Sequence, residues 1–459
     1  MKIMKSVKTS FLACACSFVL VLGWLGLAAI PVQAMTETVK PFFTFACDST
    51  GKVCPNGSTP SRLIQSADDN FYGATLMGGT GNRAAGTVFR LSPSGELTTL
   101  YTFVANASGN YPNGANPGGV VEGNDGFLYG STVAGGPSNN GVVFRLSKTG
   151  TFKILHAGGG VSVVGRDGNL YGFGTDSSGN PALVRITPTG SLQVMQTLSL
   201  RITGVYFAGL FLGSDGNMYG TTIDAESGKI TSLFRLSPSG QFRVLQTIHY
   251  GQFLVSAPIQ SENGNIYAGL DFVVQPNGAL LPGLLEEDLS ATAFHLITLA
   301  YAPQQWMGEI IEASDGNFWG ARAGTFNPMT NGAVVSFTHA GAAVQQIDLG
   351  GYGLMQASDG RILGLNGNQI FALEPALPAP KPLFVTASRP SGAVGSTVTI
   401  YGSHFVGTTR VAFNGVSATF KVLNSGNIVA LVPLGATTGP IEVTNAGGTG
   451  TSAKSFVVP

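Results

Sequence analysis

The stretch Ser214-Asp215-Gly216-Asn217-Met218-Tyr219-Gly220 decides the fold, because it recurs along the chain. Each copy is a turn of Asp, Asn and Gly followed by an aromatic residue, and the aromatic residues are Tyr72, Tyr129, Tyr171, Tyr219, Tyr267 and Trp319, with Leu363 in a worn seventh copy. Successive copies lie 42 to 57 residues apart. This is the length of a four-stranded propeller blade, so the spacing predicts a β-propeller.

Each copy also has a second half, as in Leu233-Phe234-Arg235-Leu236-Ser237-Pro238-Ser239-Gly240. Its alternation puts Phe and Leu on one face of a strand and Arg on the other, and Pro-Ser-Gly then turns the chain into an outer strand. In the first half, Asp-Gly and Asn-Gly supply a positive φ at low cost, which predicts a two-residue hairpin turn. The aromatic residue is expected to pack between neighbouring sheets. The repeated arginines, Arg90, Arg145, Arg185 and Arg235, are expected to form a structural ladder between blades.

The two ends of the repeat array complement each other. The seventh copy stops at Leu373 without an outer strand, whereas Phe42–Phe45 resembles the outer strand of a unit that has no beginning. Joining the two completes a blade with the N-terminal strand and leaves no open edge. We therefore expect a seven-bladed β-propeller over residues 39–376, with six and eight blades as the alternatives.

A second domain follows a proline-rich linker at residues 377–382. Short alternating runs separated by Gly, Pro and Asn fill residues 383–459, and this density of short strands describes an immunoglobulin-like β-sandwich. The chain is therefore predicted to be all-β. The expected strands are 384–387, 397–401, 410–413, 418–422, 428–432, 441–444 and 455–458.

The composition excludes several classes of protein. Charged residues make up 10% of the 459 residues, hydrophobic residues 44%, and Gly occurs 65 times. This is too apolar for a disordered chain and too poor in charge for a helical bundle. The formal net charge is zero, so the basic patch that would indicate nucleic-acid binding is absent.

The N-terminus predicts export. Lys2, Lys5 and Lys8 precede an apolar run that ends in Val32-Gln33-Ala34, which fits a signal peptide over residues 1–34, with a membrane anchor as the alternative. Cleavage would leave no membrane span in the mature chain. It would also leave two cysteines, Cys47 and Cys54, and in an oxidising compartment these predict one disulfide.

Two resemblances to known families add to this reading. The pattern Asp-Gly-Asn-x-Tyr-Gly, a Gly-Gly loop and Gly-x-Val-Phe-x-Leu resembles the Gloeo/Verruco tandem repeat of secreted bacterial proteins, best at residues 73–91 and 130–146. Residues 382–459, with Gly402-Ser403-His404-Phe405 and Val411–Gly415, closely resemble the IPT/TIG immunoglobulin-like domain. The first resemblance implies an extracellular propeller-like protein with no known activity. The second implies a spacer or interaction module without chemistry of its own.

Motifs for chemistry are scarce. The five histidines show no metal-ligand spacing, and no nucleophile elbow, zinc-protease motif or phosphate loop is found, so neither a cofactor nor a metal is indicated. Three carboxylates lie near the expected inner strands: Glu122, Glu309 and Glu312. The segment 286–288 (Glu-Glu-Asp) stands where other copies carry Phe-Arg-Leu, which suggests a degenerate, solvent-exposed unit.

These observations favour a secreted or cell-surface binding protein over an enzyme. The propeller would be a platform for an extracellular polysaccharide or a surface protein, the IPT/TIG domain a spacer, and the chain a monomer that binds no nucleic acid. The alternative is a carbohydrate-active or lyase-type enzyme with its site on the propeller axis. That alternative predicts that alanine at Glu309 or Glu312 abolishes a reaction without changing the melting temperature.

Overall fold

The structure is a computed structural model that describes residues 38–51, 53–198, 205–224, 230–249, 256–274, 280–289, 293–299, 307–322, 332–374 and 376–459. All regular structure in these ranges is β-strand. None of the described residues belongs to a helix that could cross a membrane. The expected signal peptide at 1–34 lies outside the described residues.

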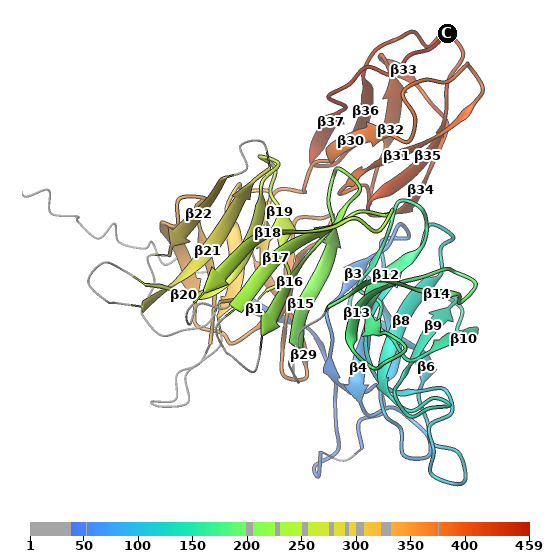
Figure 1. The fold of residues 1–459 in the computed structure, drawn as a ribbon, viewed down its shortest axis with the longest axis vertical. Coiled ribbons are helices and arrows are strands. Elements are labelled where there is room, and N and C mark those ends of the chain that lie inside the picture. Colours follow the sequence, from blue (N-terminus) through green and yellow to red (C-terminus); the bar gives the residue numbers. More distant parts are fainter. Residues whose placement is uncertain are drawn as a thin grey trace, which may run out of the picture. The chain divides into compact units, whose positions relative to one another are not determined.

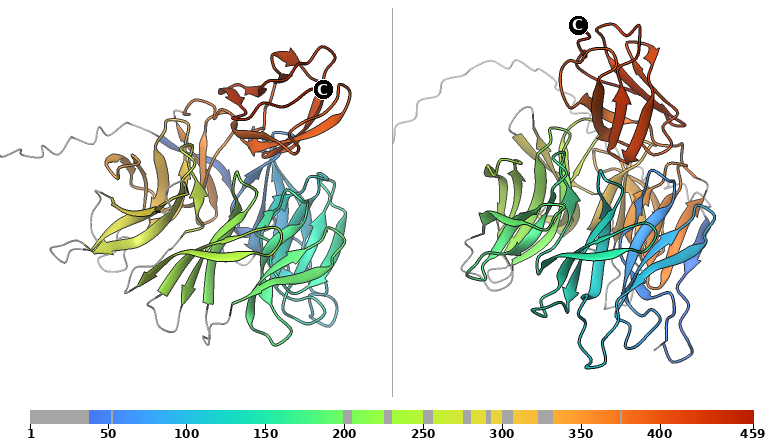
Figure 2. Two further views of the ribbon diagram at one scale, coloured as in Figure 1. Left: turned by 45° about the horizontal axis from the view of Figure 1, so that its top comes forward. Right: turned by 90° about the vertical axis from the view of Figure 1, so that its right-hand side faces the viewer.

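Seven sheets occupy the region of the repeats, and Figures 1 and 2 show them side by side around a common axis. We number them as blades 1 to 7 in chain order. Blade 1 holds β2 (Ser58–Pro60), β3 (Ile64–Gln65), β4 (Phe71–Met77), β5 (Thr87–Leu91) and β6 (Leu97–Thr102). Blade 2 holds β7 (Ala115–Glu122), β8 (Leu128–Ala134), β9 (Val142–Leu146) and β10 (Phe152–Ala157). Blade 3 holds β11 (Val163–Val164), β12 (Leu170–Thr175), β13 (Pro181–Ile186) and β14 (Leu192–Thr197).

The remaining blades repeat this order from inner to outer strand. Blade 4 holds β15 (Val205–Leu212), β16 (Met218–Asp224), β17 (Ile230–Leu236) and β18 (Phe242–His249). Blade 5 holds β19 (Ile259–Gln260), β20 (Ile266–Val274), β21 (Leu280–Asp288) and β22 (Ala293–Thr298). Blade 6 holds β23 (Met307–Glu312), β24 (Phe318–Arg322), β25 (Ala333–Phe337) and β26 (Ala343–Ile347). Blade 7 holds β27 (Tyr352–Gln356), β28 (Ile362–Asn366), β29 (Gln369–Glu374) and, as its outer strand, β1 (Thr38–Thr44).

The ring closes as the sequence predicts. β1 pairs antiparallel with β29, so the N-terminal strand completes the blade built from the last repeat. A separate hydrophobic cluster fills each of the seven gaps between neighbouring blades, including the gap between blades 7 and 1, where Leu363 and Ile370 meet Phe71 and Phe89. The Cys47–Cys54 disulfide follows directly after β1. The described residues thus form seven blades, the number that the sequence predicts.

The hairpin turns differ from the prediction. In the turn at residues 165–169, Gly168 N donates to Gly165 O and Gly165 N donates to Asn169 O, which makes a loop of three residues rather than two. Gly168 has a φ of +76° at the third position, where a type I turn needs a left-handed residue to lead into the next strand. Asp69 takes that position in the first repeat, with a φ of +63°. The expected two-residue turn was therefore wrong, because the glycine follows a type I turn instead of lying at its centre.

Residues 383–451 form two four-stranded sheets around a single core. One sheet holds β30 (Leu383–Ala387), β31 (Thr397–Ser403), β35 (Asn427–Leu431) and β34 (Phe420–Asn424). The other holds β33 (Val416–Ser417), β32 (Arg410–Phe413), β36 (Ile441–Asn445) and β37 (Gly448–Thr451). The strand expected at 455–458 is replaced by two isolated bridges, at Phe456 and Val457, because β37 takes the sheet edge instead.

Candidate functional site

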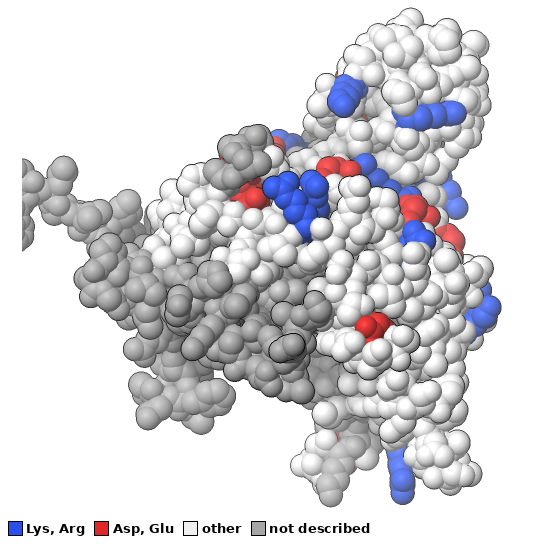
Figure 3. Space-filling view, in the orientation of Figure 1, with Lys and Arg blue, Asp and Glu red and all other residues white. Residues whose placement is uncertain are grey.

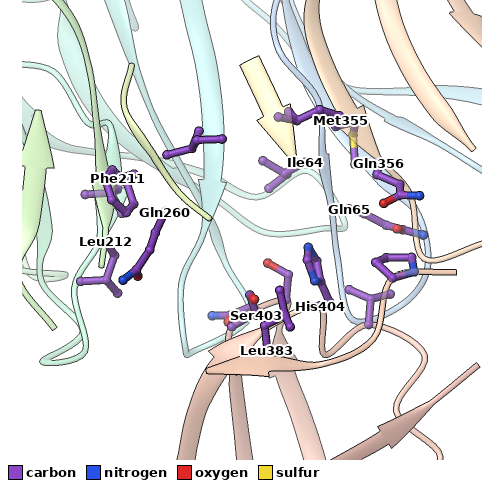
Figure 4. A pocket seen from close by; sticks show the side chains of 18 of the residues that line it. Ile64, Gln65, Phe211, Leu212, Gln260, Met355, Gln356, Leu383, Ser403 and His404 are labelled. Atoms are coloured by element: carbon purple, nitrogen blue, oxygen red, sulfur yellow. Dashed lines mark hydrogen bonds between the residues drawn. The ribbon is translucent and has the colours of Figure 1, made fainter. Parts of the chain in front are cut away.

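A cavity of about 930 Å³ lies on the propeller axis, and all seven blades contribute to its wall. The lining comes from the inner segment of each blade, just before the Asp-Gly turn, and is shown in part in Figure 4. Residues of the C-terminal domain, including Leu383, Ser403 and His404, line one end. The seven repeats can be aligned in sequence, and residues at equivalent positions form layers along the cavity wall.

The layer nearest the turns connects neighbouring blades. It consists of Gln65, Glu122, Val164, Leu212, Gln260, Glu312 and Gln356. Gln65 Oε1 accepts a hydrogen bond from Ser358 N of blade 7 at 2.7 Å, and Gln260 Oε1 accepts one from Ser214 N of blade 4 at 2.8 Å. Each amide thus satisfies a backbone N–H of the preceding blade, which indicates a structural role for this layer.

Two glutamates of this layer are bonded to the side chains of a lysine and a histidine. Glu122 Oε1 lies 2.7 Å from Lys148 Nζ, and Glu312 Oε1 lies 2.9 Å from His339 Nε2. In their own blades, Lys148 and His339 occupy the outer-turn position that Pro238 holds in blade 4. Blades 2 and 6 therefore have a glutamate at the position of Gln65 and a basic residue at the position of Pro238. Burial raises the pKa of Glu122, and the hydrogen bond from Lys148 opposes that shift.

The contacts of Glu312 do not form a catalytic triad. Ser261 Oγ lies 3.1 Å from His339 Nε2, and Glu312 Oε1 lies 2.9 Å from the same nitrogen. A nucleophile and an orienting carboxylate must bind opposite ring nitrogens of the histidine. Ser261 is also completely buried. The group instead bonds blade 6 to blade 5, as Glu312 Oε2 also accepts from Glu262 N at 2.7 Å.

One residue further from the turns, the wall is apolar in every blade. This collar consists of Ile64, Val121, Val163, Phe211, Ile259, Ile311 and Met355. All seven are half-buried, so each exposes part of its side chain to the cavity. Phe211 is the one aromatic residue of the collar, and its ring stacks on Tyr219 with the centroids 5.4 Å apart.

The third layer, two residues beyond the collar, holds two opposite charges among small residues. Gly119, Val161, Gly209, Ala257 and Gly353 occupy this position in five blades. Arg62 of blade 1 and Glu309 of blade 6 occupy the other two, and Arg62 Nη1 lies 4.0 Å from Glu309 Oε1. Glu309 Oε2 is buried without a hydrogen-bond partner among the described residues. Only Gly353, in blade 7, lies between them in the ring.

The C-terminal domain contacts the turn side of the propeller. Asn124 Oδ1 accepts hydrogen bonds from Asn424 Nδ2 at 3.0 Å and Asn427 Nδ2 at 2.7 Å. The Arg166 guanidinium lies 4.6 Å from the centre of the Tyr401 ring. Lys381 forms an ion pair with Glu262. Asn124, Arg166 and Glu262 all belong to turns that follow inner strands, so this domain lies at the turn-side end of the cavity.

The turn aspartates and the repeated arginines lie within the blades and do not line the cavity. The turn aspartates accept hydrogen bonds from the buried tyrosines, for example Tyr129 Oη to Asp125 Oδ2 at 2.6 Å. The repeated arginines pair across the strands with these tyrosines, as Arg145 does with Tyr129. The described residues contain no cluster of three or more potential metal ligands.

The expectation for the segment 286–288 was wrong. Glu287 is 5% exposed, and Glu286 Oε1 accepts a hydrogen bond from Tyr267 Oη at 2.6 Å. In this blade Asn263 replaces the turn aspartate, and Glu286 replaces the arginine that faces the tyrosine elsewhere. In blade 5 the carboxylate that bonds the tyrosine therefore comes from β21 and not from the turn. The unit is therefore a compensated variant of the repeat and not a degenerate one.

Sequence reasoning placed Glu122, Glu309 and Glu312 near the inner strands, and all three line the cavity. It missed the roles of Arg62, Lys148 and His339. Arg62 stands at a position where five of the seven copies have a small residue, so aligning the repeats would have revealed it. Lys148 and His339 are found in the same way, as departures from Pro in the outer turn. Their contacts with Glu122 and Glu312 depend on how adjacent blades pack, which single repeats do not show.

Fold and cavity together define a repeat-built β-propeller joined to an immunoglobulin-like domain. Residues 34–162 match the Gloeobacter/Verrucomicrobia repeat, and residues 382–458 match the IPT/TIG domain, which confirms both resemblances. No curated protein matches the sequence significantly.

Several solved structures are similar to the chain at low identity. A gluconolactonase from Xanthomonas campestris is 14% identical, with 75% of this chain and 92% of that chain covered and a TM-score of 0.38. The calcium-binding protein regucalcin from Agrobacterium tumefaciens is 15% identical, with coverages of 56% and 88% and a TM-score of 0.36. Prolyl oligopeptidase B from Galerina marginata is 11% identical, with coverages of 76% and 48% and a TM-score of 0.45. Likeness at this level carries no information about a shared ligand or reaction.

Proposed function

We propose that the protein is a secreted or cell-surface, non-catalytic binding protein that holds its ligand in the axial cavity of the propeller. The IPT/TIG domain acts as a spacer and a second contact module. The N-terminal sequence and the Cys47–Cys54 disulfide support an extracellular location. The ligand is an uncharged polar polymer such as an extracellular polysaccharide, since Figure 3 shows few charged side chains on the described part of the face in view.

The state of the cavity carboxylates carries the proposal. Glu122, Glu262 and Glu312 are each paired with a basic side chain, Lys148, Lys381 and His339 respectively. Glycoside hydrolysis needs two available carboxyl groups on either side of the scissile bond. Among the described residues that line the cavity, Glu309 is the one carboxylate whose nearest cation lies as far away as 4.0 Å. A single open carboxylate favours binding over general acid–base catalysis.

The alternative is an enzyme that uses Glu309. It is favoured by one observation, the buried Oε2 atom of Glu309 without a hydrogen-bond partner among the described residues. Glu312, the other residue expected for this role, is tied to blade 5 and is assigned to the structure of the ring. An enzyme would therefore have to act through Glu309 and a group of the substrate or water.

One experiment separates the two functions. The chain from residue 35 onwards is incubated with a panel of extracellular polysaccharides, and retention on the polymer is measured together with new reducing ends or unsaturated products. Retention without products supports the binding protein. Products that disappear in Glu309→Gln but persist in Glu312→Gln, with both variants folded, would establish the enzyme instead.

A further inference from the structure

We propose that Arg62 and Glu309 bind two neighbouring hydroxyl groups of one sugar ring of a neutral glycan held in the axial cavity. This inference rests on the proposed function, because it specifies the ligand and its contacts in the same cavity. Its starting point is the unused hydrogen-bonding capacity of these two side chains.

The pair is open in a way that the other cavity charges are not. The 4.0 Å between Arg62 Nη1 and Glu309 Oε1 is beyond hydrogen-bonding distance, and the side chains are 49% and 34% exposed. A guanidinium offers five N–H donors and a carboxylate about four acceptor sites. Among the described residues, the two side chains have no other partner. Glu122, by comparison, has a 4% exposed side chain with Lys148 at 2.7 Å.

Neighbouring hydroxyl groups match this pair. A hydroxyl both donates and accepts, so one can donate to the Glu309 carboxylate while the next accepts from the Arg62 guanidinium. Hydrogen bonds to charged partners are about twice as strong as neutral ones. A neutral ligand also leaves the balanced charges of the pair undisturbed. The half-exposed apolar collar, with the Phe211 ring, offers surface for the C–H faces of a sugar ring.

The layer of the pair has room for such a ring. Gly119, Val161 and Ala257 line the cavity at the positions equivalent to Arg62 and Glu309. These small side chains leave the opposite wall of the layer free of bulk. A large residue at position 161 would fill that space from blade 3, two blades away from Arg62 and three blades away from Glu309.

The pair lies beside the apolar collar along the axis. Arg62 and Glu309 lie three residues before the turn-side layer, about 10 Å further along an inner strand. Ser403 and His404 of the C-terminal domain line the turn-side end of the cavity (Figure 4). A sugar ring held by the pair therefore has the collar on its turn side.

The test uses the full mature chain and isothermal titration calorimetry. The probes are the hexaoses of cellulose, xylan, starch and chitin, together with glycylglycine as a zwitterion whose two charges could also match the pair. The variants are Arg62→Ala, Glu309→Gln and Val161→Phe. Glu312→Gln is the matched control, because it changes the same strand three residues away, where the carboxylate bonds two blades. Unfolding midpoints are recorded for every variant.

We expect one hexaose to bind, Arg62→Ala and Glu309→Gln each to weaken it about tenfold or more, and Glu312→Gln to change it less than about threefold. Val161→Phe should abolish binding.

Three results would overturn the inference. Unchanged affinity in folded Arg62→Ala and Glu309→Gln, with binding lost in Val161→Phe, would leave the cavity as the binding site and refute the role of the pair. Tighter binding of glycylglycine than of every hexaose would refute a neutral sugar as the ligand of the pair. No binding by any probe to the folded wild type would refute the proposed function itself.

Discussion

Alkaline pH should unfold this protein because of a feature repeated in five blades. Tyr72, Tyr129, Tyr171, Tyr219 and Tyr267 are 0–1% exposed, and each phenol donates a hydrogen bond to a carboxylate at 2.6 to 2.9 Å. Burial first, together with the adjacent carboxylates, raises the pKa of all five phenols above the ordinary value of 10. The folded protein therefore keeps these protons at a pH where the unfolded chain loses them.

The sign and size of the effect follow from proton binding. Above pH 10 the unfolded chain binds fewer protons than the folded protein, so the free energy of unfolding falls as the pH rises. Each phenol contributes a loss of about 1.4 kcal/mol by pH 11, and five together about 7 kcal/mol. The aspartates that accept from four of these phenols are exposed to solvent, so we halve this to about 3 to 4 kcal/mol for screening. That is a large share of a stability of about 5–15 kcal/mol.

The assay is urea unfolding followed by tryptophan fluorescence between pH 8 and pH 11, with tyrosinate absorbance recorded on the same samples. Tyrosinate absorbance of the five phenols should rise together with unfolding and not before it. Tyr171→Phe should reduce the pH dependence above pH 10 by about one fifth. Asp315→Asn is the control, because Asp315 accepts from the Trp319 indole at 3.2 Å and that group does not titrate. Equal slopes in wild type and Tyr171→Phe would refute the reasoning.

Three further predictions concern stability and covalent structure. Lys148→Ala should cost about 3 kcal/mol, because it leaves the buried Glu122 carboxylate unpaired, and adding Glu122→Gln should recover most of that loss in urea unfolding; no recovery would show that Lys148 acts through packing alone. Gly360→Ala should cost about 2 kcal/mol more than Gly264→Ala, since both have a φ near +91° but an added Cβ would lie 1.8 Å from Leu377 O only at Gly360; equal losses would contradict this. The mature protein should gain about 2 Da on reduction, and a constant mass would show that Cys47 and Cys54 are free thiols.

The sequence predicted the propeller well because its signals are local and repeated. Each copy carries its own turn, strand pattern and aromatic residue, and seven copies reinforce one another. The closing strand was predictable because Phe42–Phe45 resembles an outer strand and the last repeat lacks one. The turn length was not, because Asp-Gly is compatible with both a two-residue hairpin and a type I turn followed by a left-handed glycine.

The candidate site was harder to predict because it arises between blades. Glu309 and Glu312 are three residues apart in one strand and look equivalent in the sequence. In the structure Glu312 bonds Ser261 and the backbone of Glu262 in blade 5, while Glu309 faces Arg62 from blade 1. Which of them is available to a ligand depends on side-chain contacts across blade boundaries. The exposure expected for Glu286 failed for a different reason, since its partner Tyr267 lies on the neighbouring strand of the same blade, where blades 1 to 4 place an arginine opposite the tyrosine.

Departures from the repeat come in pairs of contacting residues, and this gives Arg62 and Glu309 their significance. Asn263 in the turn is accompanied by Glu286 on the strand, and Tyr267 Oη keeps a carboxylate partner at 2.6 Å. Glu122 is accompanied by Lys148 at 2.7 Å. In both pairs the second residue supplies the bonding partner that the first change requires. The stability of the fold is therefore enough to explain both pairs.

The third pair, Arg62 and Glu309, does not form a direct hydrogen bond. Arg62 and Glu309 replace small residues in two blades and stop 4.0 Å apart, with both side chains partly exposed to the cavity. If stability alone had produced this pair, the contact should have been as short as the other two, because an exposed pair at this distance contributes about 1 kcal/mol or less. A pair that is matched in charge but open in geometry is better explained by a third group that bonds both members. This is why we place the ligand at Arg62 and Glu309 and not at the tighter charges near the turns.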